Sequence, residues 1–249
     1  MISALLTAVI PALLLPWALI PLRSPVLFAL LPMAPLAWVY AKAVREGRAR
    51  DAAFLAIAWA AALTLSTVAA TVRSPQGAFQ TIWHAGEFRD DMVRWIATGR
   101  GQEGNISLFL PRVLAEYALV WILSALSLGI AALVLGSLLL GYMNGYVGWV
   151  VANADPVVPP LTSALVAWPP WSVARVLSFI LAGTAGALWG AMRLYRGTKA
   201  PRLVGRLALF SLLLLLVDVG LKWWLAPIWR EWLQALLGAS AGIEAGGSV

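Results

Sequence analysis

Long apolar runs dominate the hydrophobic pattern of the chain. A bilayer-spanning helix takes roughly 17–25 apolar residues, and the first runs of this kind cover residues 2–20, 26–41 and 52–72. The first run lacks the basic start and the small-residue cleavage site of a signal peptide, which indicates a retained span. The second run is short and contains Pro32 and Pro35. It predicts a kinked span or a re-entrant segment, because proline leaves backbone groups that lipid cannot satisfy.

A basic cluster separates the second run from the third. Its members are Lys42, Arg45, Arg48 and Arg50. The positive-inside rule places this cluster in the cytoplasm. The N-terminus is then cytoplasmic, and Arg73 at the end of the third run lies outside.

Residues 74–111 mix charged and apolar side chains and form no span. Ser74 and Pro75 suit the N-cap and the first position of a helix, and the glycine-rich stretch 99–104 suits its end. Between them, apolar residues approximate one helical face: Ile82, Trp83, Met92, Val93 and Ile96. This pattern predicts an extracytoplasmic segment with an amphipathic helix lying on the outer membrane interface.

Residues 113–192 are almost uniformly apolar, so their division into spans depends on whether the number of crossings is odd or even. The next basic cluster begins at Arg193, and it is cytoplasmic only if an odd number of crossings precedes it. Eighty residues are too many for one crossing and predict three. One division has spans at 113–135, 137–153 and 172–192 with a hairpin near Gly136. A rival division has one helix reaching residue 140 and an imperfect crossing through 146–168. The absence of Lys and Arg between 113 and 174 favours the first.

The C-terminal region predicts a last span at residues 207–226, an amphipathic segment at 228–237 and a flexible tail at 240–249. The sequence therefore predicts an all-α polytopic membrane helix bundle. It has about seven spans, with a range of six to eight, in a single membrane domain covering residues 1–249. The C-terminus is expected outside, in a bacterial-type inner membrane.

Composition supports the membrane assignment and restricts the chemistry. Hydrophobic residues make up 61% of the chain and charged residues 12%, against roughly 25% charged residues in soluble domains. The chain has no cysteine and one histidine, His84, so thiolate chemistry and multi-histidine metal sites within one chain are excluded. We expect no metal and no cofactor. The net charge of +7 falls in short clusters beside the spans, which argues against a nucleic-acid partner.

Tryptophan is concentrated on one side of the predicted topology. Nine of the 14 tryptophans map to the outer side: Trp83, Trp95, Trp149, Trp168, Trp171, Trp223, Trp224, Trp229 and Trp232. They form either an interfacial anchor belt or an outer-face binding platform for a lipid, a quinone-like ligand or a partner subunit. In the second interpretation the platform consists of Trp168, Trp171, Trp223 and Trp224.

A few polar positions inside the apolar runs are candidate functional residues. Asp218 and Lys222 lie four residues apart on one helical face and are expected to neutralise each other. They are candidates for substrate binding or ion coupling, or they only stabilise the helix while Lys222 reaches toward the interface. Asn144 either lines an internal cavity or bonds to a neighbouring helix. Charges nearer the interface are interpreted as anchors: Arg112, Glu116 and Arg175.

His84, Glu87 and Asp91 follow at i, i+3 and i+7 of the predicted interfacial helix. This spacing would align an imidazole with two carboxylates and could support acid and base catalysis on a lipid headgroup. Chance also produces such spacings in amphipathic helices, where Arg89 and Arg94 could pair with the acids.

Small residues predict close helix packing. Gly141 with Gly145 and Gly186 with Gly190 each form a GxxxG pattern. The chain contains no nucleotide-binding or hydrolase motif.

The sequence favours a non-catalytic permease-like protein or a membrane subunit of a transport or assembly complex. It would bind lipid, solute or partner proteins at its outer face. Expected partners are membrane lipids and either other membrane subunits or further copies of the chain. The alternative is an interfacial enzyme acting on a lipid or lipid-linked substrate.

Overall fold

A computed structural model describes residues 1–194 and 201–238; the predicted tail at 240–249 lies outside the described residues. The described residues contain helices and no strands. In chain order the helices are α1 (Ile2–Leu22), α2 (Pro25–Leu30), α3 (Ala34–Arg45), α4 (Ala49–Arg73), α5 (Pro75–Thr81), α6 (Ala85–Thr98), α7 (Ile106–Ser127), α8 (Ile130–Asn153), α9 (Pro160–Ala167), α10 (Ser172–Arg193) and α11 (Pro201–Leu237). Within the described chain, seven segments are long and apolar enough to cross a membrane, with α2 and α3 counted as one. The predicted all-α membrane bundle is confirmed.

The second span is kinked between α2 and α3. Ser24 caps α2 by accepting a hydrogen bond from the backbone N–H of Leu27 at 3.5 Å. Pro35 lies in the first turn of α3, where its missing N–H costs no helical hydrogen bond. The indole N–H of Trp59 donates to the carbonyl of Pro32 at 2.9 Å and satisfies a backbone group that the kink frees. The proline pattern therefore marks a break within one span.

Three crossings, α7, α8 and α10, occupy residues 106–193, as parity predicts, but the hairpin position was wrong. The turn lies at Leu128 and Gly129, with φ of 55° and 91°, and Gly136 lies inside α8. Gly129 is required there, because a Cβ would overlap the Tyr40 ring and because its φ disfavours other residues. Gly136 instead provides space beside Trp59.

The predicted last span and the predicted amphipathic segment belong to one continuous helix, because α11 has 37 residues. At 1.5 Å per residue it is about 55 Å long, well beyond the roughly 30 Å hydrocarbon core of a bilayer. Its final turns bury Trp229 and Leu233 against other helices. The apolar face of these final turns is therefore covered by protein, and the turns continue the helix of the span.

The predicted interfacial helix is divided into α5 and α6. Ile82 is extended, and His84 has a left-handed conformation with φ of 61°. The break lets α6 pack Met92, Trp95 and Ile96 against other helices. Gly99 ends α6 with φ of 71°, as the glycine-rich stop predicts.

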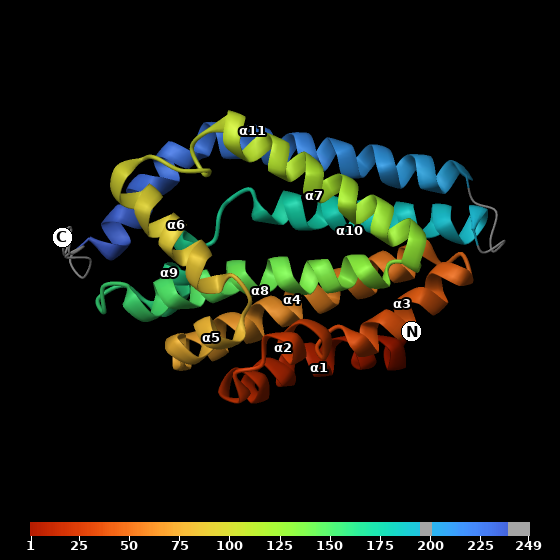
Figure 1. Ribbon diagram of the computed structural model, residues 1–249, viewed down its shortest axis with the longest axis horizontal. Helices are drawn as coiled ribbons and strands as arrows, with labels where there is room; N and C mark the ends of the chain where they lie inside the picture. Colours follow the sequence, from red (N-terminus) through yellow and green to blue (C-terminus); the bar gives the residue numbers. More distant parts are fainter. Residues whose placement is uncertain (195–200, 239–249) are drawn as a thin grey trace.

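The spans form two layers, shown in Figure 1. The first layer contains α1–α5 and α8, and the second contains α7, α10 and α11. The two helices of the α7–α8 hairpin belong to different layers, because α7 packs most extensively on α10 and α8 on α4. In Figure 1 they diverge from the hairpin toward the left, where α6 crosses the end of the bundle.

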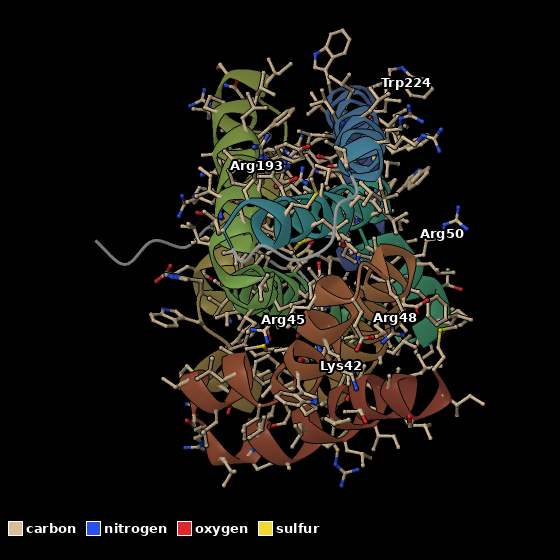
Figure 2. All side chains as sticks on the ribbon, turned by 90° about the vertical axis from the view of Figure 1, so that its right-hand side faces the viewer. Lys42, Arg45, Arg48, Arg50, Arg193 and Trp224 are labelled. Carbon is tan, nitrogen blue, oxygen red and sulfur yellow. The ribbon has the colours of Figure 1, made fainter. Side chains whose placement is uncertain are left out.

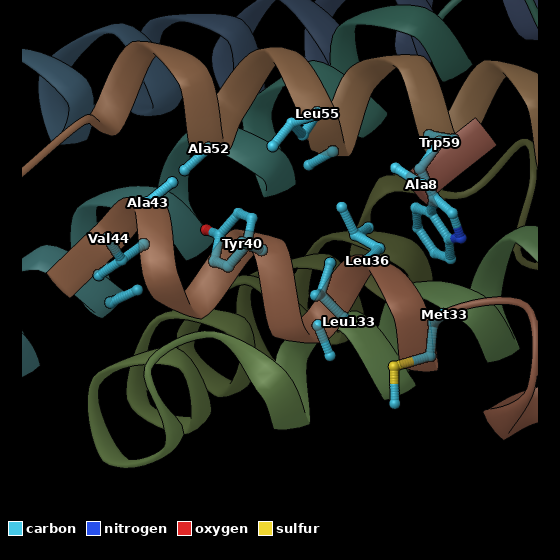
Figure 3. Packing of buried hydrophobic residues seen from close by; sticks show 14 of the residues in the cluster. Ala8, Met33, Leu36, Tyr40, Ala43, Val44, Ala52, Leu55, Trp59 and Leu133 are labelled. Atoms are coloured by element: carbon cyan, nitrogen blue, oxygen red, sulfur yellow. The ribbon is translucent and has the colours of Figure 1, made fainter. Parts of the chain in front are cut away.

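The two ends of the bundle differ in chemistry. One end, the basic end, carries Lys42, Arg45, Arg48, Arg50 and Arg193, which face the viewer in Figure 2. Just inside it, a large apolar cluster joins the layers, including Leu36, Tyr40, Leu55 and Leu133 (Figure 3). The Tyr40 hydroxyl and the Thr184 hydroxyl hydrogen bond at 3.0 Å and connect α3 to α10.

The opposite end, the tryptophan end, is closed by Trp95, Trp171 and Trp229. Trp229 lies 5.5 Å from Trp95 and 5.0 Å from Trp171 between ring centroids. Arg230 donates to the carbonyls of Ile96 and Ala97 at 2.8 and 3.0 Å. These bonds satisfy carbonyls that the end of α6 leaves free and fix α6 to α11.

Candidate functional site

Six charged residues of the second layer and of the loop that leads into it meet near the tryptophan end, and we call them the charge cluster. Four elements supply its members: Glu103 from the α6–α7 loop, Arg112 and Glu116 from α7, Arg175 from α10, and Asp218 and Lys222 from α11. Charges at this position need partners, because desolvation of an unpaired ion is expensive.

The charge cluster consists of three ion pairs. Lys222 Nζ lies 2.9 Å from Glu103 Oε2, and Arg175 Nε lies 3.0 Å from Asp218 Oδ2. Arg112 Nε lies 2.9 Å from Glu116 Oε1. Three cations face three carboxylates, so the charge cluster is neutral as a whole.

Asp218 and Lys222 do not have the arrangement expected from their spacing. Each takes a partner from another element, because their shared face of α11 points into the protein toward α10 and the α6–α7 loop. The side chains of Asp218 and Lys222 are 0% and 2% exposed, so Lys222 does not extend to the interface. Arg175 is correspondingly a partner of a buried carboxylate and not only an anchor.

Aromatic rings surround the Lys222 ammonium. Its Nζ lies 4.5 Å from the Phe109 ring centroid and 5.9 Å from that of Trp171. Both rings are nearly fully buried. They offer cation–π attraction and exclude water, which strengthens the electrostatic interactions of this ammonium.

The α6–α7 loop that carries Glu103 is rich in glycine. A Cβ on Gly101 or Gly104 would lie 3.1 or 3.0 Å from the Trp95 side chain, so the loop lies flat on this ring. Gln102 accepts a hydrogen bond from Arg112 Nη1 at 3.0 Å. Glu103 and Gln102 therefore hold the loop over the charge cluster through side-chain contacts.

Two neighbouring cavities lie at the charge cluster and share part of their lining. A polar pocket of about 40 Å³ is lined by Glu103, Arg112, Glu116, Arg175 and Lys222, together with aromatic side chains. A second cavity of about 90 Å³, which we call the apolar cavity, lies between the layers along α4, α7, α8 and α10 and is open over part of its surface. Four residues line both: Glu116, Tyr142, Met143 and Arg175. The two cavities together offer a charged end and a hydrocarbon-like end.

Two buried polar atoms of the charge cluster have no hydrogen-bond partner among the described residues. They are Arg175 Nη2 and Asp218 Oδ1. Buried polar atoms are normally hydrogen-bonded, and leaving one without a partner costs about 1–3 kcal/mol. Arg175 also lines both cavities, so the donor without a partner lies on a residue that borders this space.

A glycine stripe on α10 explains why α7 lies in the second layer. A Cβ on Gly186 would overlap the Trp121 carbonyl, and one on Gly190 would overlap the Ala125 carbonyl. This GxxxG pattern brings the α7 and α10 backbones together, as predicted. Gly141 and Gly145 of α8 instead contact Ile82 side-chain atoms. The other side of α7, toward α8, has no comparable close approach at the level of the apolar cavity.

Asn144 bonds to a neighbouring helix. Its side-chain N–H donates to Thr64 Oγ1 at 3.0 Å and joins α8 to α4, while its Oδ1 has no partner among the described residues. Asn144 is buried and does not line either cavity of the charge cluster. Of the two interpretations of this residue, the interhelical bond agrees with the contacts.

His84 and Glu87 meet at the surface of the tryptophan end. His84 Nδ1 lies 2.6 Å from Glu87 Oε2. Asp91 pairs with Arg94 at 3.3 Å, and the side chains of His84, Glu87 and Asp91 are all exposed. The structure thus brings together two of the three predicted residues, and their catalytic role stays a prediction.

The four tryptophans of the predicted platform lie in different environments. Trp171 is 1% exposed, because it packs edge-on against Trp229, and Trp168 is half-buried. Trp223 and Trp224 are 67% and 68% exposed on α11; Figure 2 shows Trp224 at the periphery. A single surface of four exposed indoles is therefore not present, and any binding role of these residues stays a prediction.

Sequence reasoning assigned Arg112, Glu116 and Arg175 to the interface and did not single out Glu103. The alternating direction of successive spans could have indicated the site. α7 and α10 both start at the end where α11 finishes, so charges in their first three turns lie at a similar depth to Asp218 and Lys222. The direction of the spans does not reveal which charges face one another.

The chain matches no protein-family model, no curated protein and no solved structure. The fold and its apolar helices identify a multi-pass membrane protein. Among the described residues, no group of three or more His, Cys, Asp or Glu side chains is arranged to hold a metal ion.

Proposed function

We propose that this protein is a permease-like membrane protein, or the membrane subunit of a larger complex, that binds an amphiphile between its two layers. A lipid or lipid-linked molecule would place its polar headgroup at the charge cluster and its hydrocarbon in the apolar cavity. The observation that carries the proposal is that the charged pocket and the apolar cavity lie next to each other and share lining residues.

The lining of each cavity supports a divided ligand. Both volumes exceed the roughly 10–15 Å³ that a water molecule needs. The 90 Å³ cavity, however, is lined mostly by apolar side chains such as Val176, Phe179 and Ile180, and such cavities stay dry and bind hydrocarbon. The smaller pocket offers charged donors and acceptors. A molecule with one polar and one apolar end satisfies both.

The orientation follows from the basic clusters. We place the basic end in the cytoplasm of a bacterial-type cell, because Lys and Arg are retained on that side during insertion. The tryptophan end and the end of α11 then face outward. The ligand would enter from the outer half of the membrane, between the diverging α7 and α8.

Gly136→Leu tests this function. A Cβ at Gly136 would lie 3.9 Å from the nearest Trp59 atom, so a leucine fits into the apolar cavity without a backbone clash. Leucine also favours the helix over glycine by about 0.5–1 kcal/mol, so the variant should fold. We expect lipid to co-purify with the wild-type protein and to be lost from this variant, measured by native mass spectrometry after detergent extraction.

Gly220→Leu is the matched control. Gly220 is exposed on α11, and a Cβ there meets no atom within 4 Å. This variant should retain lipid like the wild type. Equal lipid content in the wild-type protein and both variants would refute binding in the apolar cavity.

An interfacial enzyme is the second candidate, because His84 and Glu87 form a hydrogen-bonded pair of 2.6 Å. Both side chains are accessible from the outer surface in the proposed orientation. This pair could remove a proton from a substrate bound at headgroup level.

A further inference from the structure

This inference rests on the proposed function and specifies its ligand. We infer that the headgroup carries one negative charge and binds Lys222 at the place that the Glu103 carboxylate occupies in the structure. Glu103 is then a latch whose carboxylate competes with the headgroup.

The charge balance of the cluster supports a single anion. With Glu103 in place, Arg112, Arg175 and Lys222 are matched by three carboxylates. Without Glu103, one positive charge remains in surroundings where an unpaired ion is costly. A ligand with one negative charge restores neutrality when the latch leaves.

The position of Glu103 makes it the member that can move. The other five residues of the charge cluster lie on α7, α10 and α11, where displacement would require movement of a span. Glu103 lies in the loop between α6 and α7, flanked by Gly101 and Gly104. Its side chain is 15% exposed, while its partner Lys222 is 2% exposed. The loop can therefore withdraw the carboxylate and leave the ammonium in place.

The pocket provides donors for an anion with two oxygens. Lys222 Nζ loses its acceptor when Glu103 leaves, and Arg175 Nη2 already lacks one among the described residues. Both residues line the polar pocket. Phosphodiester and carboxylate groups present two charged oxygens, which suits two separate N–H donors. The apolar cavity next to Arg175 then accepts the attached hydrocarbon.

The apparent Kd for the ligand equals the intrinsic Kd divided by the fraction of time that the latch is open. If the loop is closed about nine-tenths of the time, removing the carboxylate should tighten binding about tenfold. A zwitterionic headgroup gains less, because its own cation is opposed by the freed positive charge. The effect is therefore specific to anionic ligands.

The test compares Glu103→Gln with the wild type in titrations monitored by native mass spectrometry. The probes are phosphatidylglycerol and phosphatidylcholine with identical acyl chains. For Glu103→Gln we expect an apparent Kd for phosphatidylglycerol that is about tenfold lower, and little change for phosphatidylcholine. Glu231→Gln, at an exposed position of α11, is the control and should bind both lipids like the wild type.

Glu103→Asp covers the case in which the glutamine variant does not fold. It keeps the charge but shortens the side chain, which weakens the contact with Lys222 and should give a smaller gain in the same direction. Unchanged or weaker phosphatidylglycerol binding in the folded variants would overturn the latch. An equal gain for both lipids would overturn the anionic headgroup.

Two further arms separate this inference from its premise. Glycerophosphoglycerol carries the singly charged phosphodiester headgroup of phosphatidylglycerol without its acyl chains, and binding as tight as that of phosphatidylglycerol would show that a soluble anion, not a lipid, is recognised. Gly136→Leu tests the premise alone. If this variant binds both lipids like the wild type, the proposed function fails, whatever the Glu103 variants do.

Discussion

The two sides of α7 show how one helix can be fixed on one side and open on the other. Toward α10, Gly186 and Gly190 bring the backbones so close that no side chain fits between them. Toward α8, the helices share the hairpin at Leu128 and Gly129 and then diverge around the apolar cavity. In lipid, hydrophobicity does not drive helices together, so small residues and polar contacts decide which pairs pack.

The same comparison applies to polar groups. At the packed interface of α10 with α11, Ser178 and Ser211 exchange hydrogen bonds of 2.8 and 2.9 Å with each other's backbone. On the open side of α7, charged residues line the space, and Arg175 Nη2 has no partner among the described residues. Polar atoms without a described partner also occur elsewhere, as at Asn144 Oδ1. What sets the open side apart is therefore the charge of the residues that line it.

Gly190→Ala should have the largest effect, because it adds a Cβ where the Ala125 carbonyl lies. α7 and α10 must then separate along their tight interface, at a cost of about 3 kcal/mol. For a chain of this size we expect a melting temperature about 10 °C lower, measured by size-exclusion chromatography of heated, detergent-solubilised protein.

Gly205→Ala is the control for this first prediction. A Cβ at Gly205 of α11 meets no atom within 4 Å, so alanine should leave stability unchanged or raise it slightly. If Gly190→Ala is as stable as this control, the contrast between the two sides of α7 is not set by the glycine stripe.

Asp218→Asn should have the second largest effect. It removes the carboxylate 3.0 Å from Arg175 and leaves that guanidinium buried without its counter-charge. Asparagine keeps the size and one acceptor, so we expect about 2 kcal/mol of destabilisation, or a melting temperature about 5 °C lower.

Asp91→Asn is the matched control for Asp218→Asn, because Asp91 forms an exposed pair with Arg94. Such surface pairs contribute about 0–1 kcal/mol. Equal melting temperatures for the two variants would show that the charge cluster is not electrostatically special.

His84→Ala should have the smallest effect on both stability and lipid binding. The His84 side chain is 59% exposed, and its partner Glu87 is also at the surface. Surface substitutions usually change stability by less than about 0.5 kcal/mol, and His84 lines neither cavity of the charge cluster. The measurements are the melting temperature and lipid retention. If instead the folded variant loses turnover of a lipid substrate that the wild type converts, the interfacial enzyme becomes the better interpretation.

The sequence predicted the bundle more reliably than its turns. Long apolar runs and basic clusters were enough for the number of crossings, because a bilayer sets a minimum length for each span. The sequence predicts the hairpin near Gly136, because two glycines seven residues apart look alike in an apolar run. Only the contact with Tyr40 and the left-handed backbone distinguish Gly129.

The candidate site was only partly predictable. Asp218 and Lys222 are charges in an apolar run, which singles them out in the sequence. Both are buried in the structure. Their partners Arg175 and Glu103 lie 43 and 119 positions away in the chain, and periodicity within one helix carries no information about such distant contacts. The wrong pairing came from applying a rule for isolated helices to a helix with neighbours on its charged face.

The sequence by itself determined that this is a multi-span helical membrane protein, because backbone hydrogen bonding and bilayer thickness restrict what an apolar chain can form. It also determined that Asp218 and Lys222, as charges inside an apolar run, must be partnered. The tertiary structure decided the partners, the two layers and the space between α7 and α8. Those features depend on side-chain shape across helices, above all on which glycines allow two backbones to approach and which leave room beside a ring.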